Sequence, residues 1–485
     1  MRYVTGLYPR VRVDVAKSGA VVQPGGVLLT ETVRASGLDV SLRDELDRFT
    51  RFGARHHLGK IVTDLAITLA LGEDDLAGAG LIRDEPRVYG PVASHATLSR
   101  RVADLAAGGD AVLRAIRKAH SAARARVWNL AGDRAPGTGR TAANPLIIDL
   151  DATLVTSHSD KELAAGTWKG GFGFHPMCAF IDHGPGGAGE TAALLLRPGN
   201  AGSNTAADHI GVTKAALAQV PGFTGRSRAD RTIMVRTDTA GGTKAFVNWL
   251  AKHRFSYSLG FPITDEVTEA IETISTGFNE NTDSFGVWEP AVDGDGEVRD
   301  GAWVTELTGL LPKLTEQGWP PGMRVIVRRE RPHPGAQSGL FDVDGYRHHT
   351  FITNTPTSFK AAGGNVRLAT LELRHRRRAR AEDRVRCGKQ TGLGRLPLQG
   401  FAQNQIWLQL VALATDLITW AQMLALHGTD AANWEPKRLR VRLFSIPATI
   451  ARGARRLTLH LAEHSRWSTL IHASITRLRG LPAPT

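Results

Sequence analysis

The stretch NPLIIDLDATLVTS, residues 144–157, runs an apolar segment directly into two carboxylates, Asp149 and Asp151. An apolar run of this length with turn residues before it predicts a buried strand. Because side chains alternate along a strand, Asp149 and Asp151 share one face. Two kinds of site use such a pair. In one, the first aspartate is a nucleophile and the second a general acid, and in the other an aspartate belongs to a set of carboxylates that binds metal ions.

The order of the following elements favours the metal-binding set. The motif Asp-x-Asp-x-Thr resembles that of haloacid dehalogenase-like phosphatases, but those proteins alternate strand and helix from the first strand. Here no helix is predicted between the first strand and the two strands that follow it, because the Gly-rich segment 166–176 has a low helix propensity. We predict strands over 146–156, 170–182 and 190–199, a helix over 203–222 capped by Ser203, a strand over 231–238, a helix over 241–253 and a strand over 254–261. This order resembles that of the ribonuclease H-like fold, an α/β fold with an antiparallel meander followed by parallel strands.

The composition indicates a polyanionic partner. The 485 residues include 60 Lys and Arg against 47 Asp and Glu, a formal charge of +13. Such an excess favours nucleic acid, although a merely basic soluble enzyme would share it. Two distant cysteines, Cys178 and Cys387, argue against a disulfide scaffold and a zinc site. With no secretory signal and no membrane-length uncharged run, we expect a cytoplasmic protein with no membrane partner.

Residues 1–133 are predicted to form a mostly helical DNA-binding region, after short strands in the first 30 residues. A short helix ending at Pro86, a turn, and a helix over 94–106 resemble a helix-turn-helix. The residues that would project toward a groove are Thr97, Ser99, Arg100 and Arg101. An ordinary helical hairpin with a solvated basic face is the alternative. The Gly/Pro-rich segment 132–145 marks the boundary to the core.

Asp238, at the end of the strand 231–238, is a candidate for the second acid of a metal site. A third acid is needed to hold two hard cations. Residues 371–388 predict an arginine-dense helix ended by Gly388. Glu382 lies in that helix between four arginines, which should keep it ionised. The alternative is a solvated basic helix whose acids only neutralise it.

The spacing on this helix resembles a known signature. Bacterial insertion-sequence transposases of the DDE type carry Tyr-x-x-Arg-x-x-x-Glu-x-x-x-x-x-x-Lys here. This chain has His375, Arg378, Glu382 and Lys389 at those spacings, with His in place of Tyr. The stretches IDLDATLV, VRTDTAGG, KGGFGFHP and RPGNAGSNTAADH look like further blocks of the DDE group-one transposases. The resemblance runs from about 144 to 426.

The resemblance implies the roles of individual residues. Asp151, which Thr153 follows, would be the first acid, with Asp149 as the alternative; Asp238 and Glu382 would be the second and third. Together they would hold two Mg²⁺ ions, or Mn²⁺. DNA would be contacted by Arg378, Lys389 and His375, the last of which stands where the signature has Tyr. It further implies cutting and joining of double-stranded DNA at the terminal inverted repeats of the protein's own insertion sequence, transfer to target DNA, and a homodimer associated with the bacterial nucleoid.

The remaining segments complete the predicted organisation. The core occupies 146–264 and 371–426 and is interrupted by a β-rich insertion over 265–370. Trp288, Trp303 and Trp319 in the insertion are predicted core anchors, with stacking on a flipped base as the alternative. In the C-terminal basic region, 427–485, we predict an edge strand over 436–444 and an amphipathic helix over 466–480. Two other functions stay open: a phosphatase with Asp149 as nucleophile, and a DNA-binding transposase remnant without activity.

Overall fold

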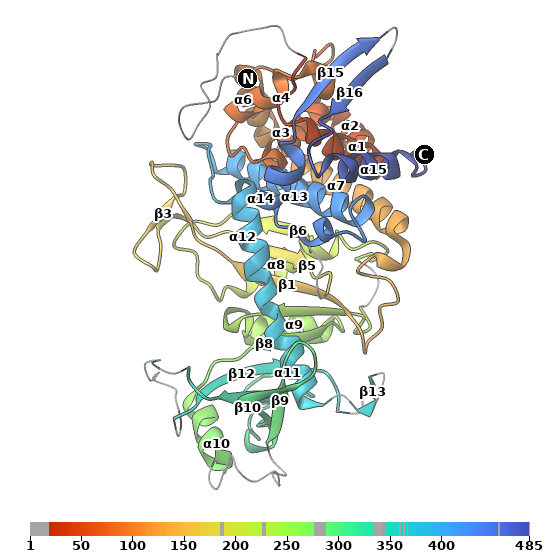
Figure 1. Cartoon of the computed structure of the whole chain (residues 1–485). Helices are drawn as coiled ribbons and strands as arrows, with labels where there is room; N and C mark the ends of the chain where they lie inside the picture. The colour runs from red at the N-terminus through yellow and green to blue at the C-terminus, as the bar shows by residue number, and fades with distance from the viewer. Residues whose placement is uncertain are drawn as a thin grey trace, which may run out of the picture.

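The computed structural model of the chain has helices at one end, a large sheet across the middle and a β-rich part at the other end (Figure 1). The expected strands near the N-terminus fall largely in residues 1–18, outside the described part. The structure describes residues 19–184, 189–225, 229–275, 288–333, 335, 343, 345–357, 360–361, 364–365, 367–453 and 456–484.

The centre of the molecule is a mixed nine-stranded sheet in the order β6-β5-β1-β7-β8-β12-β11-β10-β9. β1 pairs antiparallel with β5, which pairs antiparallel with β6, while β1, β7 and β8 run parallel to one another. The predicted meander followed by parallel strands is therefore confirmed. The bounds are β1 Leu146–Ala152, β5 Met177–Ile181, β6 Glu190–Leu195, β7 Ile233–Thr237 and β8 Ser256–Gly260.

The predicted second strand is divided in two at Pro176. Its first part, β4 (Phe172–Phe174), leaves the main sheet and forms a small sheet with β2 (Val155–Thr156) and β3 (Ala165–Gly166). Proline lacks a backbone donor and so interrupts a ladder. The two crossovers between parallel strands are the predicted helices, α8 (Ala206–Leu217) and α9 (Lys244–Lys252), although the residue capping α8 is Thr205 and not Ser203.

The insertion continues the core sheet. β12 pairs antiparallel with β8, so the insertion strands extend the same sheet outward. Trp288 and Trp319 are buried, at 4% and 8% exposed, which confirms them as core anchors. The elements are α10 Asp265–Ser275, β9 Glu289–Val292, β10 Val298–Glu306, β11 Arg324–Glu330, β12 Arg347–Thr353, β13 Lys360–Ala361 and β14 Gly364–Asn365.

One helical run crosses the sheet from the insertion toward the N-terminal helices (Figure 1). It consists of α11 (Leu368–Arg376), a 3₁₀ turn (Arg377–Ala379) and α12 (Arg380–Gly388). The predicted stop at Gly388 is confirmed as the end of α12, and a π turn (Lys389–Leu393) follows it. The chain turns at Gly392, where φ is 97° and the carbonyl accepts a 3.1 Å hydrogen bond from the indole of Trp407.

The N-terminal helices do not form a separate unit, because they pack around the long helix α13 (Phe401–Leu424) and share one hydrophobic core with the sheet. Within the described residues, α13 alone has the length and composition of a membrane span, and 89% of its apolar window is buried inside the protein. The N-terminal helices are α1 Val27–Ser36, α2 Leu38–Leu46, α3 Leu58–Leu71, α4 Gly80–Arg83, α5 Pro86–Tyr89, α6 His95–Ala107 and α7 Gly109–Ala131.

A buried polar cluster joins α7, β6 and α13. Arg124 donates to Glu190 at 2.9 Å and to Asp416, and both acids are fully buried. Glu190 also accepts from the indoles of Trp128 and Trp420, at 2.8 and 2.6 Å. Buried charges are tolerated only when paired in this way, so the cluster fixes the N-terminal helices on the sheet.

The C-terminal region corrects one prediction. Residues 436–444 form a helix, α14 (Pro436–Leu439), and a π turn (Arg440–Phe444), not an edge strand. Proline at the first helical position favours this start, and Arg440 donates to the carbonyls that end α3. After the hairpin of β15 (Ala448–Gly453) and β16 (Arg456–Leu461), the predicted helix is confirmed as α15 (Ser468–Arg479).

Candidate active site

Asp151 and Asp238 line one cavity of about 540 Å³. β1 and β7 are parallel neighbours, so their carboxyl ends meet at the same edge of the sheet. Asp151 lies near the end of β1, and Asp238 follows β7 and accepts the N–H of Ala240 at 3.1 Å. The turn after Asp238 lies close to Gly260 at the end of β8, where a Cβ would lie 2.4 Å from the nitrogen of Thr239. Glycine there lets β8 approach the turn.

The surroundings of Asp151 disfavour its negative charge. Burial, followed by the neighbouring charge of Asp238, raises the pKa of Asp151 to about 6. Glu382 contributes to this rise, whereas Arg378 and the N–H of Ala152 oppose it. The excess of negative charge around Asp151 is a feature that a bound cation would relieve.

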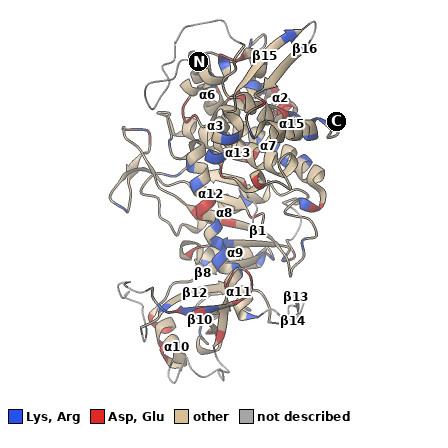
Figure 2. Cartoon of the chain, viewed as in Figure 1, with Lys and Arg blue, Asp and Glu red and all other residues tan. Residues whose placement is uncertain are grey.

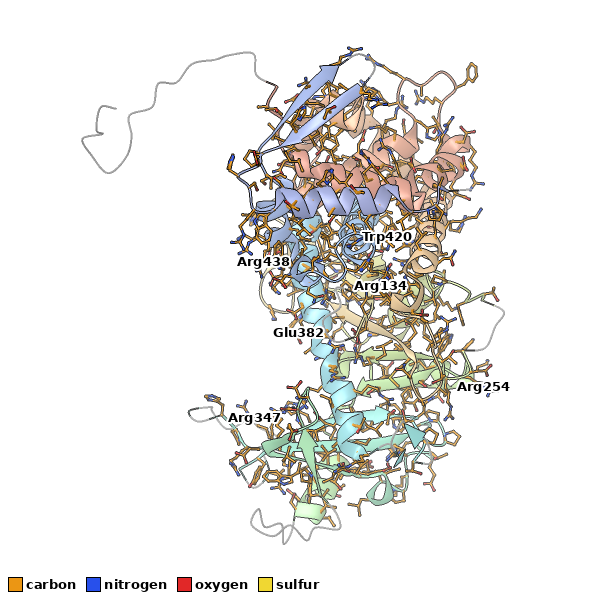
Figure 3. The ribbon with its side chains drawn as sticks, turned by 45° about the vertical axis from the view of Figure 1, so that its right-hand side comes forward. Arg134, Arg254, Arg347, Glu382, Trp420 and Arg438 are labelled. Carbon is orange, nitrogen blue, oxygen red and sulfur yellow. The ribbon has the colours of Figure 1, made fainter. Side chains whose placement is uncertain are left out.

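Glu382 lies on the surface of α12 (Figure 3) and is not one of the residues that line this cavity. Its side chain is 66% exposed and forms an ion pair with Arg378 at 3.6 Å. In the described part of the chain, no three His, Cys, Asp or Glu residues lie close enough to hold one metal ion together. The structure thus brings two of the predicted acids into one cavity and places the third near enough to affect the pKa of Asp151.

Asp149 is engaged elsewhere. It is 2% exposed, and its two carboxylate oxygens accept hydrogen bonds from Arg236 at 2.6 and 2.7 Å. A guanidinium thus binds both carboxylate oxygens of Asp149, which leaves Asp151 the freer of the two acids. The same ion pair leaves Asp149 unsuited to act as a phosphatase nucleophile. Asp149 and Asp151 lie two residues apart in β1 and so share a face.

Arg236 was not singled out by the sequence prediction, yet it connects the strands to the acidic helix. It donates to the carbonyl of Arg374 at 2.7 Å and to Asp182 at 2.9 Å, and Asp182 also pairs with Arg380 at 3.0 Å. Burial alone would lower the pKa of Arg236, but Asp149 and Asp182 raise it above its ordinary value. The sequence did indicate a role for Arg236, because it lies inside the apolar strand IMVRT and a buried charge requires a partner.

The predicted DNA contacts on the acidic helix divide into two groups. Lys389 is exposed and donates to the carbonyl of Leu154 at 3.0 Å, and Arg378 lies beside Glu382. His375, the third predicted DNA contact, is different, because its ring contacts other residues of the protein. Its ring stacks on Phe351 with centroids 4.4 Å apart and hydrogen-bonds to Ser258, and burial lowers its pKa to about 3. A neutral, stacked ring packs α11 on the sheet.

The predicted recognition residues lie in the first turns of α6. Ser99 and Arg100 are exposed, whereas Thr97 is half-buried and Arg101 pairs with Asp104 at 2.7 Å. The predicted short helix, turn and helix are present as α4, the single-turn α5 and α6. Basic side chains also lie along α12 and near the tip of the β15–β16 hairpin (Figure 2).

A basic chain with acids at neighbouring parallel strand ends, and a further acid on an arginine-rich helix, fits an enzyme that acts on nucleic acid. The chain belongs to the family described as transposase DDE domain group 1, whose model matches residues 5–483. The protein is therefore a DNA transposase, as the sequence resemblance predicted, and nothing in the comparisons supports the phosphatase or the remnant.

Comparison with solved structures finds a likeness to the piggyBac transposase in its synaptic complex with hairpin DNA. The identity is 9% and the TM-score 0.41, and the match covers 88% of this chain and 82% of that one. No curated protein matches the sequence.

Proposed function

We propose that this transposase cuts and joins DNA at the terminal inverted repeats of its own insertion sequence, with Asp151, Asp238 and Glu382 as its catalytic acids. The observation that carries the proposal is the shared cavity of Asp151 and Asp238 at adjacent parallel strand ends. The strand order supports a ribonuclease H-like core. Because two ends must be held together, the active form would be a homodimer, working at the bacterial nucleoid.

The donor set fits a pair of Mg²⁺ ions, with Mn²⁺ as the alternative. Carboxylate oxygens are the ligands that hard cations prefer, and burial and the charge of Asp238 outweigh the opposing effect of Arg378 in raising the pKa of Asp151. When bound, the ions would activate a water and relieve charge on the leaving oxygen. Asp151 and Asp238 would hold them from the strand ends. Glu382 would join from α12, since its exposed ion pair with Arg378 is worth at most about 1 kcal/mol.

The same residues serve both steps of the reaction. Phosphodiester hydrolysis releases a 3′-hydroxyl at the end of the element, and this hydroxyl then takes the place of water in attacking target DNA. No side chain becomes covalently attached, so the three acids only need to hold their positions. Arg378 and Lys389 would bind phosphates beside the cut, Arg through two parallel hydrogen bonds and Lys as a point charge.

The direct test is cleavage of a duplex that carries the terminal repeats of the element. With Mg²⁺ we expect nicks at the repeat ends, and after addition of target DNA we expect joined products. Chelation of the metal should abolish both. A preparation that binds the repeats but nicks no DNA in Mg²⁺ or Mn²⁺ would contradict the proposed chemistry, while leaving the family assignment intact.

Removing the phosphate contacts should weaken binding without changing its sequence preference. We expect Arg378→Ala and Lys389→Ala each to lower affinity for all duplexes alike and to reduce the slope of log affinity against log salt by about one. Fluorescence anisotropy over a salt series measures this. Lys252→Ala, which removes an exposed lysine at the end of α9 outside the cavity, is the control. An unchanged slope in both variants would contradict the contacts.

The helix α6 should carry part of the sequence preference. We propose that its exposed Ser99 and Arg100 read base edges of the terminal repeat. Arg100→Ala is expected to lose about 1–3 kcal/mol of discrimination between the repeat and a scrambled duplex. Competition binding measures the ratio. An equal loss of affinity for both duplexes would reduce Arg100 to a phosphate contact.

A further inference from the structure

The cavity that holds Asp151 and Asp238 has an exposed tryptophan in its wall. Trp168 lines the cavity and is 72% exposed. The tryptophans considered for base stacking from the sequence are different ones, and two of these, Trp288 and Trp319, are buried in the insertion. An exposed tryptophan in the wall of a cavity can offer a large aromatic surface to a bound ligand.

Trp168 is carried by a hairpin with a fixed base, residues 165–174, here named the Trp168 hairpin. Its strands β3 and β4 are joined by a tight turn in which Thr167 accepts from Gly170 and donates to Gly171, at 3.0 and 2.7 Å. Gly170 has a φ of 76°, a conformation suited to glycine. The turn therefore presents the side chain of Trp168 from a defined backbone.

The base of the hairpin is held against the loop that forms the opposite wall. A Cβ on Gly199 would lie 2.3 Å from the carbonyl oxygen of Ala165, so the two backbones are in close contact there. Phe174 is fully buried, and its ring lies 6.3 Å from that of Phe401. The tip is thus exposed while the base is part of the core.

The rest of the cavity wall combines apolar residues, such as Leu150 and Met177, with polar side chains. Asn200, Ser203 and Asn204 are exposed and can donate to and accept from a nucleobase edge. Lys169 lies with its ammonium 4.9 Å from the centre of the Trp168 ring, where it can face a phosphate. A cavity of about 540 Å³ with an aromatic wall and amide groups has the size and composition of a small-ligand site.

We infer that Trp168 is a stacking platform for one unpaired nucleobase of the strand being cut. The inference rests on the proposed function, because it places the nucleotide next to the phosphate held at Asp151 and Asp238. The chemistry of the site is that of single-stranded nucleic acid recognition, in which a base stacks on an aromatic ring whatever its identity. Drawing that nucleotide out of the duplex would bring its phosphate into the cavity.

The test compares Trp168→Ala with the wild type on duplexes that have one abasic nucleotide, moved stepwise along the terminal repeat. On intact DNA, we expect the variant to bind and cleave about ten- to a hundred-fold less well. At the position whose base stacks on Trp168, the abasic substitution should remove this difference, because neither protein then has a base to stack. A purely structural role would give the same loss at every position.

The controls keep the outcomes separate. Trp168→Phe should recover most of the loss, and Phe52→Ala, which removes an exposed aromatic outside the cavity, should have no effect. The proposal would be overturned if Trp168→Ala lost binding and cleavage equally at every abasic position, if it lost neither, or if it converted a dimer to monomers. If the wild type nicks no DNA, the proposed function fails, whereas the binding comparison still decides whether Trp168 stacks on a base.

Discussion

Asp238→Asn is expected to abolish cleavage at the element ends while leaving binding of those ends intact. The substitution keeps the size of the side chain and its place after β7, where the oxygen accepts the N–H of Ala240. It removes the charge that a metal ion requires. A loss of several kcal/mol of charge stabilisation corresponds to a cleavage rate that is lower by a factor of at least about 10³.

The measurement is single-turnover cleavage of a labelled repeat end, with affinity determined separately in the absence of metal. Asp230→Asn is a matched control, because Asp230 precedes β7 at its other end and pairs with Arg254 on the surface. It should cleave at the wild-type rate. If Asp238→Asn lost binding and cleavage in equal proportion, Asp238 would be a structural or DNA-contacting residue and the acid set would need revision.

Metal identity offers a second readout of the same site. Asp238→Cys replaces a hard oxygen ligand by a softer sulfur, which accepts Mn²⁺ better than Mg²⁺. Partial recovery of cleavage in Mn²⁺ alone would tie Asp238 to the metal directly. No recovery in either ion would leave the asparagine result as the only support.

The order of the core elements was predictable because each element carries a strong local pattern. A continuous apolar run defines β5, and the helical spacing of α8 and the turn signals around it define the crossover. Once the strands were predicted, the two acids at strand ends, Asp151 and Asp238, could be predicted to meet, because the carboxyl ends of parallel strands lie at one edge of the sheet. Residues 436–444 show the limit of this approach. Leu439, Val441 and Leu443 alternate as in a strand, but Pro436 starts a helix and Val441 is 69% exposed.

The pairing of Asp149 could not be predicted from local pattern. Asp149 and Asp151 look equivalent in the sequence and share a face, yet one is paired with an arginine 87 residues away. His375 is comparable: the signature spacing placed it with the DNA contacts, whereas the stacking on Phe351 from the insertion places it in the packing of α11. Both outcomes depend on which strand lies next to which, information that only the folded chain contains.

The buried ion pair of Asp149 and Arg236 yields the second prediction. Arg236→Met would leave the carboxylate of Asp149 buried without a partner, and we expect the free energy of unfolding to fall by about 3–5 kcal/mol. The paired replacement Asp149→Leu with Arg236→Met removes both charges and should recover most of that stability, because apolar residues often replace a buried pair without loss. Chemical denaturation measures both changes.

The double variant Asp149→Leu with Arg236→Met should be stable and yet cleave DNA poorly, because α12 is no longer held in position. Arg236 also donates to the Arg374 carbonyl and to Asp182, which holds Arg380 on α12. Without those contacts the helix that carries Glu382 loses its connection to the strands that carry Asp151 and Asp238. We therefore expect the stable double variant to cleave about 10- to 100-fold more slowly and to require more Mg²⁺, as when partners of metal ligands are removed.

A comparable arginine on another strand supplies the control for this second prediction. Arg324 on β11 donates to Glu306 and to the carbonyl of Thr355, within the insertion and away from α12. Arg324→Met should lower stability while leaving the Mg²⁺ requirement of the folded protein unchanged. If instead the double variant at 149 and 236 regained both stability and the wild-type Mg²⁺ dependence, the pair would serve folding alone, and the position of Glu382 would have to depend on other contacts of α12.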